Sequence, residues 1–233
     1  MRQPQLIITK DGSHSLWTPG LDETYHSAHG AIQESRYIFI NHGLLYWLHN
    51  HTQPSISILE VGLGTGLNAL LTYLELLEKR VGITYTGLEP YPIPWKYVQR
   101  FNYAAQLTQN KTYPTTYKKL QTTFKQLHQA AATSSYQLSD DFLFQKKNCS
   151  LQTFCMPPNT FDLVYFDAFS PSKQPMMWSV DILEKVYRMM KRHGIMVTYC
   201  AQGKLRRDLK QLGMHVETIS GPPGKREMTR AQK

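Results

Sequence analysis

The amino-acid sequence predicts an α/β fold, in which helices cover both faces of a mostly parallel sheet and a final hairpin adds an antiparallel edge. From residue 55 onward, short apolar runs typical of strands alternate with periodic apolar segments typical of helices. Near the C-terminus, two strand-like runs flank the turn sequence Gly221-Pro222-Pro223-Gly224. Because 233 residues suffice for one core and show no linker or internal repeat, we expect a single domain over residues 1–233.

This domain is expected to consist of an N-terminal elaboration, residues 1–54, and a Rossmann-like core, residues 55–233. The elaboration begins with a hairpin, because Leu6-Ile7-Ile8 and Leu16-Trp17 flank the turn dipeptide Asp11-Gly12. A helix rich in aromatic residues is expected over about 32–50. The hairpin and this helix therefore precede the first strand of the core.

The core is expected to alternate strands and helices. Strands are predicted over 56–61, 83–88, 142–144, 161–166 and 195–199, helices over 67–79, from about 95, and over 180–191 and 204–212, and a closing hairpin over 214–219 and 225–230. Residues 107–139 are polar and rich in Gln, Thr and Lys, so we expect helix and loop there.

Composition favours a cytoplasmic protein with a polyanionic partner. No apolar run approaches the roughly 18 residues of a membrane span, and no signal segment is evident. The three cysteines form no CxxC pair, which suits a reducing compartment. His26 and His29 could share a metal ion, but we favour local hydrogen bonding and expect no metal site. The net charge of +9 favours a nucleic acid through counterion release.

A glycine-rich turn follows the first core strand and opens a helix. In Glu60-Val61-Gly62-Leu63-Gly64-Thr65-Gly66, the third glycine comes one residue earlier than in the dinucleotide-binding fingerprint. Glycines let the backbone turn tightly and approach a ligand. The carboxylate of Glu60 suits a positively charged group, such as the ammonium of a methionine moiety, either directly or through water. Asn68, in the following helix, is assigned to the same site; the alternative is a purely structural turn.

Polar residues also follow the second and third core strands. The carboxylate of Glu89 can accept hydrogen bonds from both hydroxyls of a ribose, although capping of the next helix is the alternative. Asn148 follows the third strand, where it can contact the edge of an adenine. Together with the glycine turn, these residues predict a nucleoside-binding crevice.

The fourth strand ends in Asp167-Ala168-Phe169-Ser170-Pro171. This segment resembles the (D/N)-P-P-(Y/F) loop of amine-modifying methyltransferases, with alanine in place of the first proline. In such loops the polar residue accepts a hydrogen bond from the attacking nitrogen and the aromatic ring packs on the substrate. The resemblance implies these catalytic roles for Asp167 and Phe169, and it places Asp167 beside the methyl donor, S-adenosylmethionine.

Nearly the whole chain resembles the methyltransferase domain of the MnmC-type tRNA 5-methylaminomethyl-2-thiouridine biosynthesis proteins. The matching stretches are Asp22 to Ser27, Gly30 to Ser35, Glu60 to Leu71, Phe161 to Trp178, Val197 to Cys200 and Gly221 to Met228. The resemblance implies a class I fold, S-adenosylmethionine as cofactor, tRNA as partner and N-methylation of 5-aminomethyl-(2-thio)uridine at the wobble position. The fused relatives carry an FAD-dependent oxidase half that this sequence lacks, so we expect a stand-alone form without FAD and without an obligate protein partner.

Four further residues are candidates for substrate contacts. Tyr25 and Glu34 lie in matching stretches before the sheet, where they either close over the site or lock the N-terminal segment onto the domain. Lys225 and Arg226 are candidates for tRNA phosphates, the alternative being a surface pair of Arg226 with Glu227. Residues 107–139 and Lys147-Asn148 match the family least, which weakens the adenine assignment.

Three other functions remain open at this point. The first is a class I N-methyltransferase that acts on a protein or a small amine, which keeps the cofactor site without RNA. The second is an aminopropyltransferase, which Glu60 disfavours because its carboxylate suits an intact amino-acid group. The third is a non-catalytic RNA-binding module, which the joint presence of Glu60, Glu89 and Asp167 disfavours.

Overall fold

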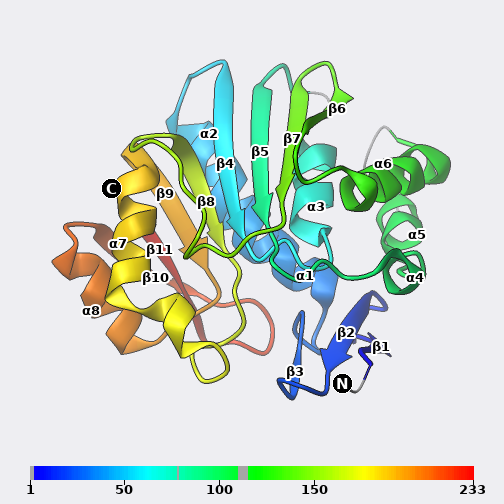
Figure 1. The fold of residues 1–233 in the computed structure, drawn as a ribbon, viewed down its shortest axis with the longest axis horizontal. Helices are drawn as coiled ribbons and strands as arrows, with labels where there is room; N and C mark the ends of the chain where they lie inside the picture. The colour runs from blue at the N-terminus through cyan, green and yellow to red at the C-terminus, as the bar shows by residue number, and fades with distance from the viewer. Residues whose placement is uncertain (1–2, 78, 110–114) are drawn as a thin grey trace.

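Two strands that are buried on both faces form the centre of the protein. All six residues of β8 (Phe161–Phe166) are buried, as are five of the seven in β4 (Ser55–Val61), so neither strand presents a face to water. The computed structural model describes residues 3–77, 79–109 and 115–233, and in it these strands pair in parallel (Figure 1). The apolar runs read from the sequence are thus the middle of a sheet covered on both sides.

Eight strands form the main sheet, in the order β10-β11-β9-β8-β4-β5-β7-β6. The remaining strands are β5 (Gly82–Leu88), β6 (Ser135–Ser139), β7 (Phe142–Lys147), β9 (Met190–Thr198), β10 (His215–Ser220) and β11 (Glu227–Gln232). The five strands from β9 to β7 are parallel, while β11 and β6 pair antiparallel with them. The expected parallel core and its antiparallel closing hairpin are therefore confirmed.

Helices cover both faces of this sheet, each with its own apolar core (Figure 1). One face carries the continuous helical segment α1 (Ala31–Ser35), η1 (Arg36–Leu45) and α2 (Tyr46–Asn50), together with α3 (Leu67–Glu75), α4 (Trp95–Val98), α5 (Tyr103–Thr108) and α6 (Tyr117–Gln129). The other face carries the short η2 (Pro175–Trp178), α7 (Val180–Met189) and α8 (Gly203–Gln211). Because the core strands are parallel, the loops that follow β4, β5 and β8 lie at one edge of the sheet.

The predicted N-terminal hairpin is present and anchors the first helix. Strands β1 (Gln5–Ile8) and β2 (His14–Thr18) pair antiparallel, and the short β3 (Glu23–Thr24) joins β2. At the turn, Asp11 Oδ2 accepts from the Gln33 amide at 3.0 Å, and Thr9 Oγ1 accepts from the Ala31 amide at 3.2 Å. Because the first amides of a helix lack intrahelical partners, the hairpin turn supplies the cap that α1 itself lacks.

The helix predicted over 67–79 ends at Glu75, and the structure differs from the sequence prediction more substantially in three other places. The helix expected over 32–50 has a ten-residue π-helix, η1, in its middle, which the hydrophobic period does not distinguish from α-helix. Strand β6 lies within the polar segment expected to be helix and loop. The helix expected to reach 191 ends at Met189 and β9 begins at Met190, with a bulge around His193, whose φ is positive.

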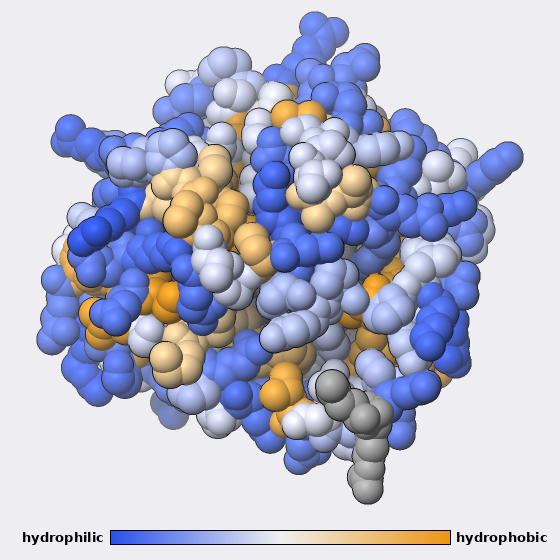
Figure 2. All heavy atoms as spheres, in the orientation of Figure 1, coloured by the Kyte–Doolittle hydropathy of each residue, from blue (hydrophilic) through white to orange (hydrophobic). Residues whose placement is uncertain are grey.

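Polar residues cover most of the surface in the view of Figure 2, and the apolar areas there are small and separate. Within the described residues, no helix is long and apolar enough to cross a membrane.

Candidate functional site

The glycine turn lies between β4 and α3 and passes very close to the loop after β8. Gly62, Gly64 and Gly66 have φ values of +91°, +48° and +72°, a region that residues with a side chain rarely adopt. A Cβ on Gly62 would lie 2.5 Å from the carbonyl oxygen of Asp167. The turn and the Asp167 loop can therefore meet only because no side chain separates them.

Glu60 is fully buried behind this turn and is bonded to protein groups. Its carboxylate accepts from Tyr85 Oη at 2.7 Å and from Asn68 Nδ2 at 2.9 Å. Burial raises the pKa of Glu60 well above its ordinary value, an effect larger than the opposing effect of these hydrogen bonds. Of the two modes open from sequence, direct contact with a ligand is disfavoured, and Glu60 instead orients Asn68.

Asn68 connects Glu60 with Asp167. The same Nδ2 group donates to Asp167 Oδ2 at 2.9 Å, so one amide holds both carboxylates. Its Oδ1 atom is buried and has no hydrogen-bond partner within the described residues. A buried amide oxygen without a partner is costly, which marks it as an acceptor for a ligand donor.

Glu89 follows β5 and reaches back to the glycine turn. Its Oε2 accepts from the Gly64 amide at 2.9 Å and its Oε1 from the Tyr91 amide at 3.0 Å. Burial raises the pKa of Glu89, because these two bonds compensate only part of the lost hydration. Asn148 is exposed just after β7, whose residue Lys147 pairs with the last residue of β5, so Asn148 follows alongside Glu89.

The loop that begins with Asp167 is fixed along its backbone. The Asp167 amide donates to Val61 O at 2.9 Å, Tyr199 Oη donates to Ala168 O at 2.8 Å, and Trp178 Nε1 donates to Phe169 O at 2.9 Å. Next in the loop, the Ser170 hydroxyl donates to Glu23 in the N-terminal sheet. The loop is thus held from β4, from the residue that follows β9, from η2 and from β3, so the protein itself fixes the position of Asp167.

Asp167 titrates close to neutrality in this setting. Burial and, less strongly, the nearby Glu34 carboxylate raise its pKa to about 7 against the lowering effects of the Asn68 hydrogen bond and the Lys225 ammonium. Carboxyl groups with such displaced pKa values concentrate at sites where protons and charge move. Asp167 therefore changes charge within the physiological pH range.

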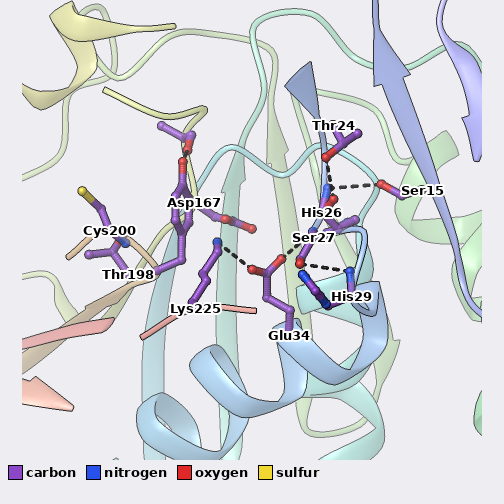
Figure 3. A network of polar contacts seen from close by, with 12 residues as sticks. Ser15, Thr24, His26, Ser27, His29, Glu34, Asp167, Thr198, Cys200 and Lys225 are labelled. Atoms are coloured by element: carbon purple, nitrogen blue, oxygen red, sulfur yellow. Dashed lines mark hydrogen bonds and ion pairs between the residues drawn. The ribbon is translucent and has the colours of Figure 1, made fainter. Parts of the chain in front are cut away.

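Segments from the two ends of the chain meet beside Asp167 (Figure 3). Glu34 Oε2 accepts from the Ser27 amide at 2.8 Å, and its Oε1 pairs with Lys225 Nζ at 2.7 Å. The Lys225 ammonium also lies 3.9 Å from the centre of the Tyr199 ring. Lys225 thus points into the site, and the phosphate contact for which it was a candidate stays a prediction.

Tyr25 and Arg226 complete the set of residues singled out from the sequence. The Tyr25 ring lies against Gly64, where a Cβ would be 3.0 Å from its Cδ1, and makes an edge contact with Phe169 at 5.1 Å between centroids. Tyr25 therefore lies over the site, whereas Glu34 ties the N-terminal segment to the C-terminal hairpin. Arg226 is exposed, and the alternative of a surface pair with Glu227 is wrong because Glu227 pairs with Arg206 at 2.9 Å, so the phosphate contact stays a prediction for Arg226.

Two histidines that the sequence did not assign to the site support the glycine turn. His26 Nε2 lies 2.7 Å from the Thr65 hydroxyl, and His128 Nε2 donates to Thr65 O at 3.0 Å. Burial lowers the pKa of each to about 4, so both are neutral. His29 Nδ1 lies 3.4 Å from Lys10 Nζ, and the described residues contain no group of three or more His, Cys, Asp or Glu side chains that could hold a metal ion.

A shallow cavity of about 620 Å³ lies near the amino end of β8, at the opposite edge of the sheet from these residues. It is lined by Cys155, Met156, Tyr187, Arg188 and Lys233, among others, beside α7 and the loop that enters β8. This loop leads into the amino end of β8, whereas Asp167 follows the carboxyl end. None of the lining residues belongs to the candidate site.

The strand order and the glycine turn after the first core strand define the class I S-adenosylmethionine-dependent methyltransferase fold. The crystal structure of MNMC2 from Aquifex aeolicus superposes with a TM-score of 0.75, covers 99% of this chain and 70% of that chain, and is 23% identical. More particularly, residues 110–233 match the model of a family described as S-adenosyl-L-methionine-dependent methyltransferase. The chain belongs to that family, and the expected fold and cofactor class are thereby confirmed.

Curated relatives carry a more specific description. The tRNA 5-methylaminomethyl-2-thiouridine biosynthesis bifunctional protein MnmC of Burkholderia multivorans is 27% identical over 96% of this chain and 34% of its own length. The protein of the same name from Leptospira interrogans is 28% identical over 89% of this chain and 32% of its length. The chain therefore spans about a third of the length of these relatives.

Proposed function

We propose that this protein transfers a methyl group to the primary amine of 5-aminomethyl-(2-thio)uridine at the wobble position of tRNA. The observation that carries the proposal is the fixed Asp167 carboxylate, which adjoins the glycine turn at the carboxyl edge of the sheet. The names of the curated relatives supply the substrate class. A tRNA substrate would also place the protein in the cytoplasm.

The residues around the turn fit S-adenosylmethionine. The Asn68 oxygen, which has no partner among the described residues, can accept from the ammonium of the methionine moiety just after the glycine turn. Glu89 can hold the ribose hydroxyls, and Asn148 lies next to it for the adenine edge. When bound, the cofactor supplies an activated methyl group on its sulfonium sulfur.

Asp167 is better suited to orient the amine than to remove its proton. A primary alkylammonium has a pKa near 10, whereas the pKa of Asp167 is raised to about 7. Direct proton transfer between them would be uphill by about 4 kcal/mol. We infer that Asp167 accepts a hydrogen bond from the amine and stabilises the positive charge that develops on nitrogen, while the proton leaves to water.

The test is methyl incorporation into tRNA purified from cells that lack this modification step. Labelled cofactor should transfer methyl groups to the wobble uridine, and fully modified tRNA should accept none. Incorporation into bulk protein or small amines, with none into the hypomodified tRNA, would favour the alternative N-methyltransferase. No transfer to any acceptor, with tRNA still bound, would favour the non-catalytic module.

We expect tRNA affinity to fall steeply with salt. The net charge of +9, with the exposed Arg226 beside the site, favours phosphate contacts whose formation releases counterions. Between roughly 50 and 200 mM salt the affinity should fall by at least about tenfold. Binding measured by filter retention checks this, with S-adenosylhomocysteine affinity as the salt-insensitive control. Flat tRNA binding over this range would contradict the electrostatic argument.

Glu89→Ala should weaken S-adenosylmethionine binding by about 10- to 100-fold, because the ribose loses a charged acceptor. Calorimetric titration measures the affinity, and a thermal melt verifies that the variant is folded. Glu184→Ala is the matched control, because this acid lies on α7 and pairs with Arg188 at the surface. Equal affinities for Glu89→Ala and the unaltered protein would mean that Glu89 only caps the turn at Tyr91.

A further inference from the structure

The acidic surroundings of Asp167 already hold one positive charge. Lys225, from the loop between β10 and β11, places its ammonium 2.7 Å from Glu34 Oε1 and 3.9 Å from the centre of the Tyr199 ring. In Figure 3 this nitrogen lies beneath the Asp167 side chain, on the side from which Glu34 approaches. An alkylammonium thus rests between a carboxylate and an aromatic face, next to the proposed catalytic residue.

The groups around this ammonium are fixed by contacts of their own. Glu34 is only 8% exposed, and the Ser27 amide holds its second oxygen at 2.8 Å. The Tyr199 hydroxyl is fixed by its bond to Ala168 O, so the ring face stays turned toward Lys225. A carboxylate combined with a Tyr face is a general receptor for alkylammonium ions, because it replaces lost hydration with charge and π-electron density.

The place that Lys225 occupies is reachable from solvent. The Lys225 side chain is 29% exposed, compared with 9% for the Glu34 side chain. Lys225 also sits on a loop, where Gly224 has a positive φ, rather than within a strand. Its ammonium can therefore withdraw by movement of its own side chain and loop when another cation takes its place beside Glu34.

We propose that Glu34, the Tyr199 ring and Asp167 form the subsite for the substrate's ammonium, and that Lys225 occupies this subsite in the unliganded enzyme. The proposal rests on the proposed function in one respect, that the acceptor is a primary amine. The aminomethyl group and the end of a lysine side chain are both alkylammonium ions, so one receptor fits either. Lys225 then acts as an internal competitor that a substrate must displace.

Internal competition lowers the apparent affinity of the subsite, because only the fraction of molecules without Lys225 in place can bind. The probe is benzylammonium, an aminomethyl group on an aromatic ring, with neutral benzyl alcohol as its uncharged analogue. Lys225→Met, which keeps the length of the side chain and removes the charge, should bind benzylammonium about tenfold or more tightly than the unaltered protein. Benzyl alcohol should bind equally weakly to both in calorimetric titration.

Further variants locate the effect. Adding Glu34→Gln or Tyr199→Leu to Lys225→Met should abolish the gain, because each removes one wall of the subsite. Lys173→Met is the matched control, since this exposed lysine follows the Asp167 loop and its loss changes the net charge equally. An equal gain in Lys173→Met would reduce the effect to general electrostatics, and no gain in Lys225→Met would overturn the proposal.

A measurement on the unaltered protein covers the case in which Lys225→Met does not fold. Benzylammonium should increase the modification of Lys225 by acetic anhydride relative to that of Lys173, a ratio that corrects for the reagent that benzylamine itself consumes. An unchanged ratio of Lys225 to Lys173 modification under saturating benzylammonium would also overturn the proposal. Both assays work without RNA, so an intact subsite in a protein that fails to methylate tRNA would remove only the tRNA assignment.

Discussion

Asp167→Ala is expected to lower the rate of methyl transfer by about 100-fold or more while leaving S-adenosylmethionine affinity within a few-fold of the original. The carboxylate is fixed by Asn68 and by the backbone bond of its own residue to Val61, and it faces the proposed amine subsite. Its interaction strengthens as positive charge moves from sulfur to nitrogen, so its loss raises the barrier more than it weakens binding. Single-turnover methylation of hypomodified tRNA measures the rate.

Asp167→Asn separates orientation from charge. An amide oxygen still accepts a hydrogen bond from the amine, so a mild loss would indicate that orientation dominates. A loss as large as that of Asp167→Ala would indicate that the negative charge is essential. If both variants merely melt at lower temperature and keep the activity of the folded fraction, Asp167 is a structural residue and the catalytic assignment is wrong.

The same residue should shape the pH dependence of the reaction. Because burial raises the pKa of Asp167 to about 7, the carboxylate is protonated below this pH and charged above it. The substrate amine, with a pKa near 10, must also lose a proton, and this adds a slope of about one to the logarithm of kcat/KM at every pH below 10. The logarithm of kcat/KM should therefore rise with a slope of about two below pH 7 and about one above it. Asp167→Asn should show a slope of about one throughout, and an unchanged break would exclude Asp167 as its source.

Gly62→Ala should abolish most of the activity although glycine has no functional side chain. The added methyl group would lie 2.5 Å from the Asp167 carbonyl oxygen, and the φ of +91° disfavours any residue with a Cβ. The glycine turn and the Asp167 loop would have to separate, which displaces Asp167 from the methyl donor. We expect at least about a 100-fold loss of methylation, because small misplacements at a reacting centre are costly, and weaker cofactor binding.

Gly20→Ala is the control for this experiment, because no atom lies within 4 Å of a Cβ there and its φ is not positive. Its activity and melting temperature should match those of the unaltered protein. Near-normal methylation in Gly62→Ala would show that the two loops tolerate separation, which contradicts the close approach as a requirement of the site.

The core strands could be predicted because their burial leaves a direct mark on the sequence. β8 is apolar at five of its six positions, and its predicted bounds, 161–166, agree with the structure. β6 could not be predicted in the same way, because Ser135–Ser139 is polar and largely exposed and pairs with β7 through its backbone. The boundary between α7 and β9 was missed because apolar spacing continues through Met189 and Met190, both buried.

The sequence predicted those site residues that follow parallel strands. Glu60, Glu89 and Asp167 lie at or just beyond the ends of β4, β5 and β8, and parallel pairing brings such positions to one edge. The supporting contacts of Tyr199 and His128 depend on tertiary packing that no local pattern records. His128 lies in the polar segment that matches the family least, yet it bonds to the glycine turn.

The ion pair between Glu34 and Lys225 beside Asp167 has a consequence for folding during synthesis. A growing polypeptide emerges from the ribosome with its N-terminal segment first, and Glu34 is synthesised 191 residues before Lys225, so the ion pair between them can form only after both segments have emerged. Until then the Glu34 carboxylate lacks its ion-pair partner, and the Tyr199 ring lacks its cation–π contact with Lys225. Nascent chains that stop before Lys225 should therefore lack this tie between the N-terminal segment and the C-terminal hairpin, and limited proteolysis should cleave their N-terminal segment faster than that of chains containing Lys225.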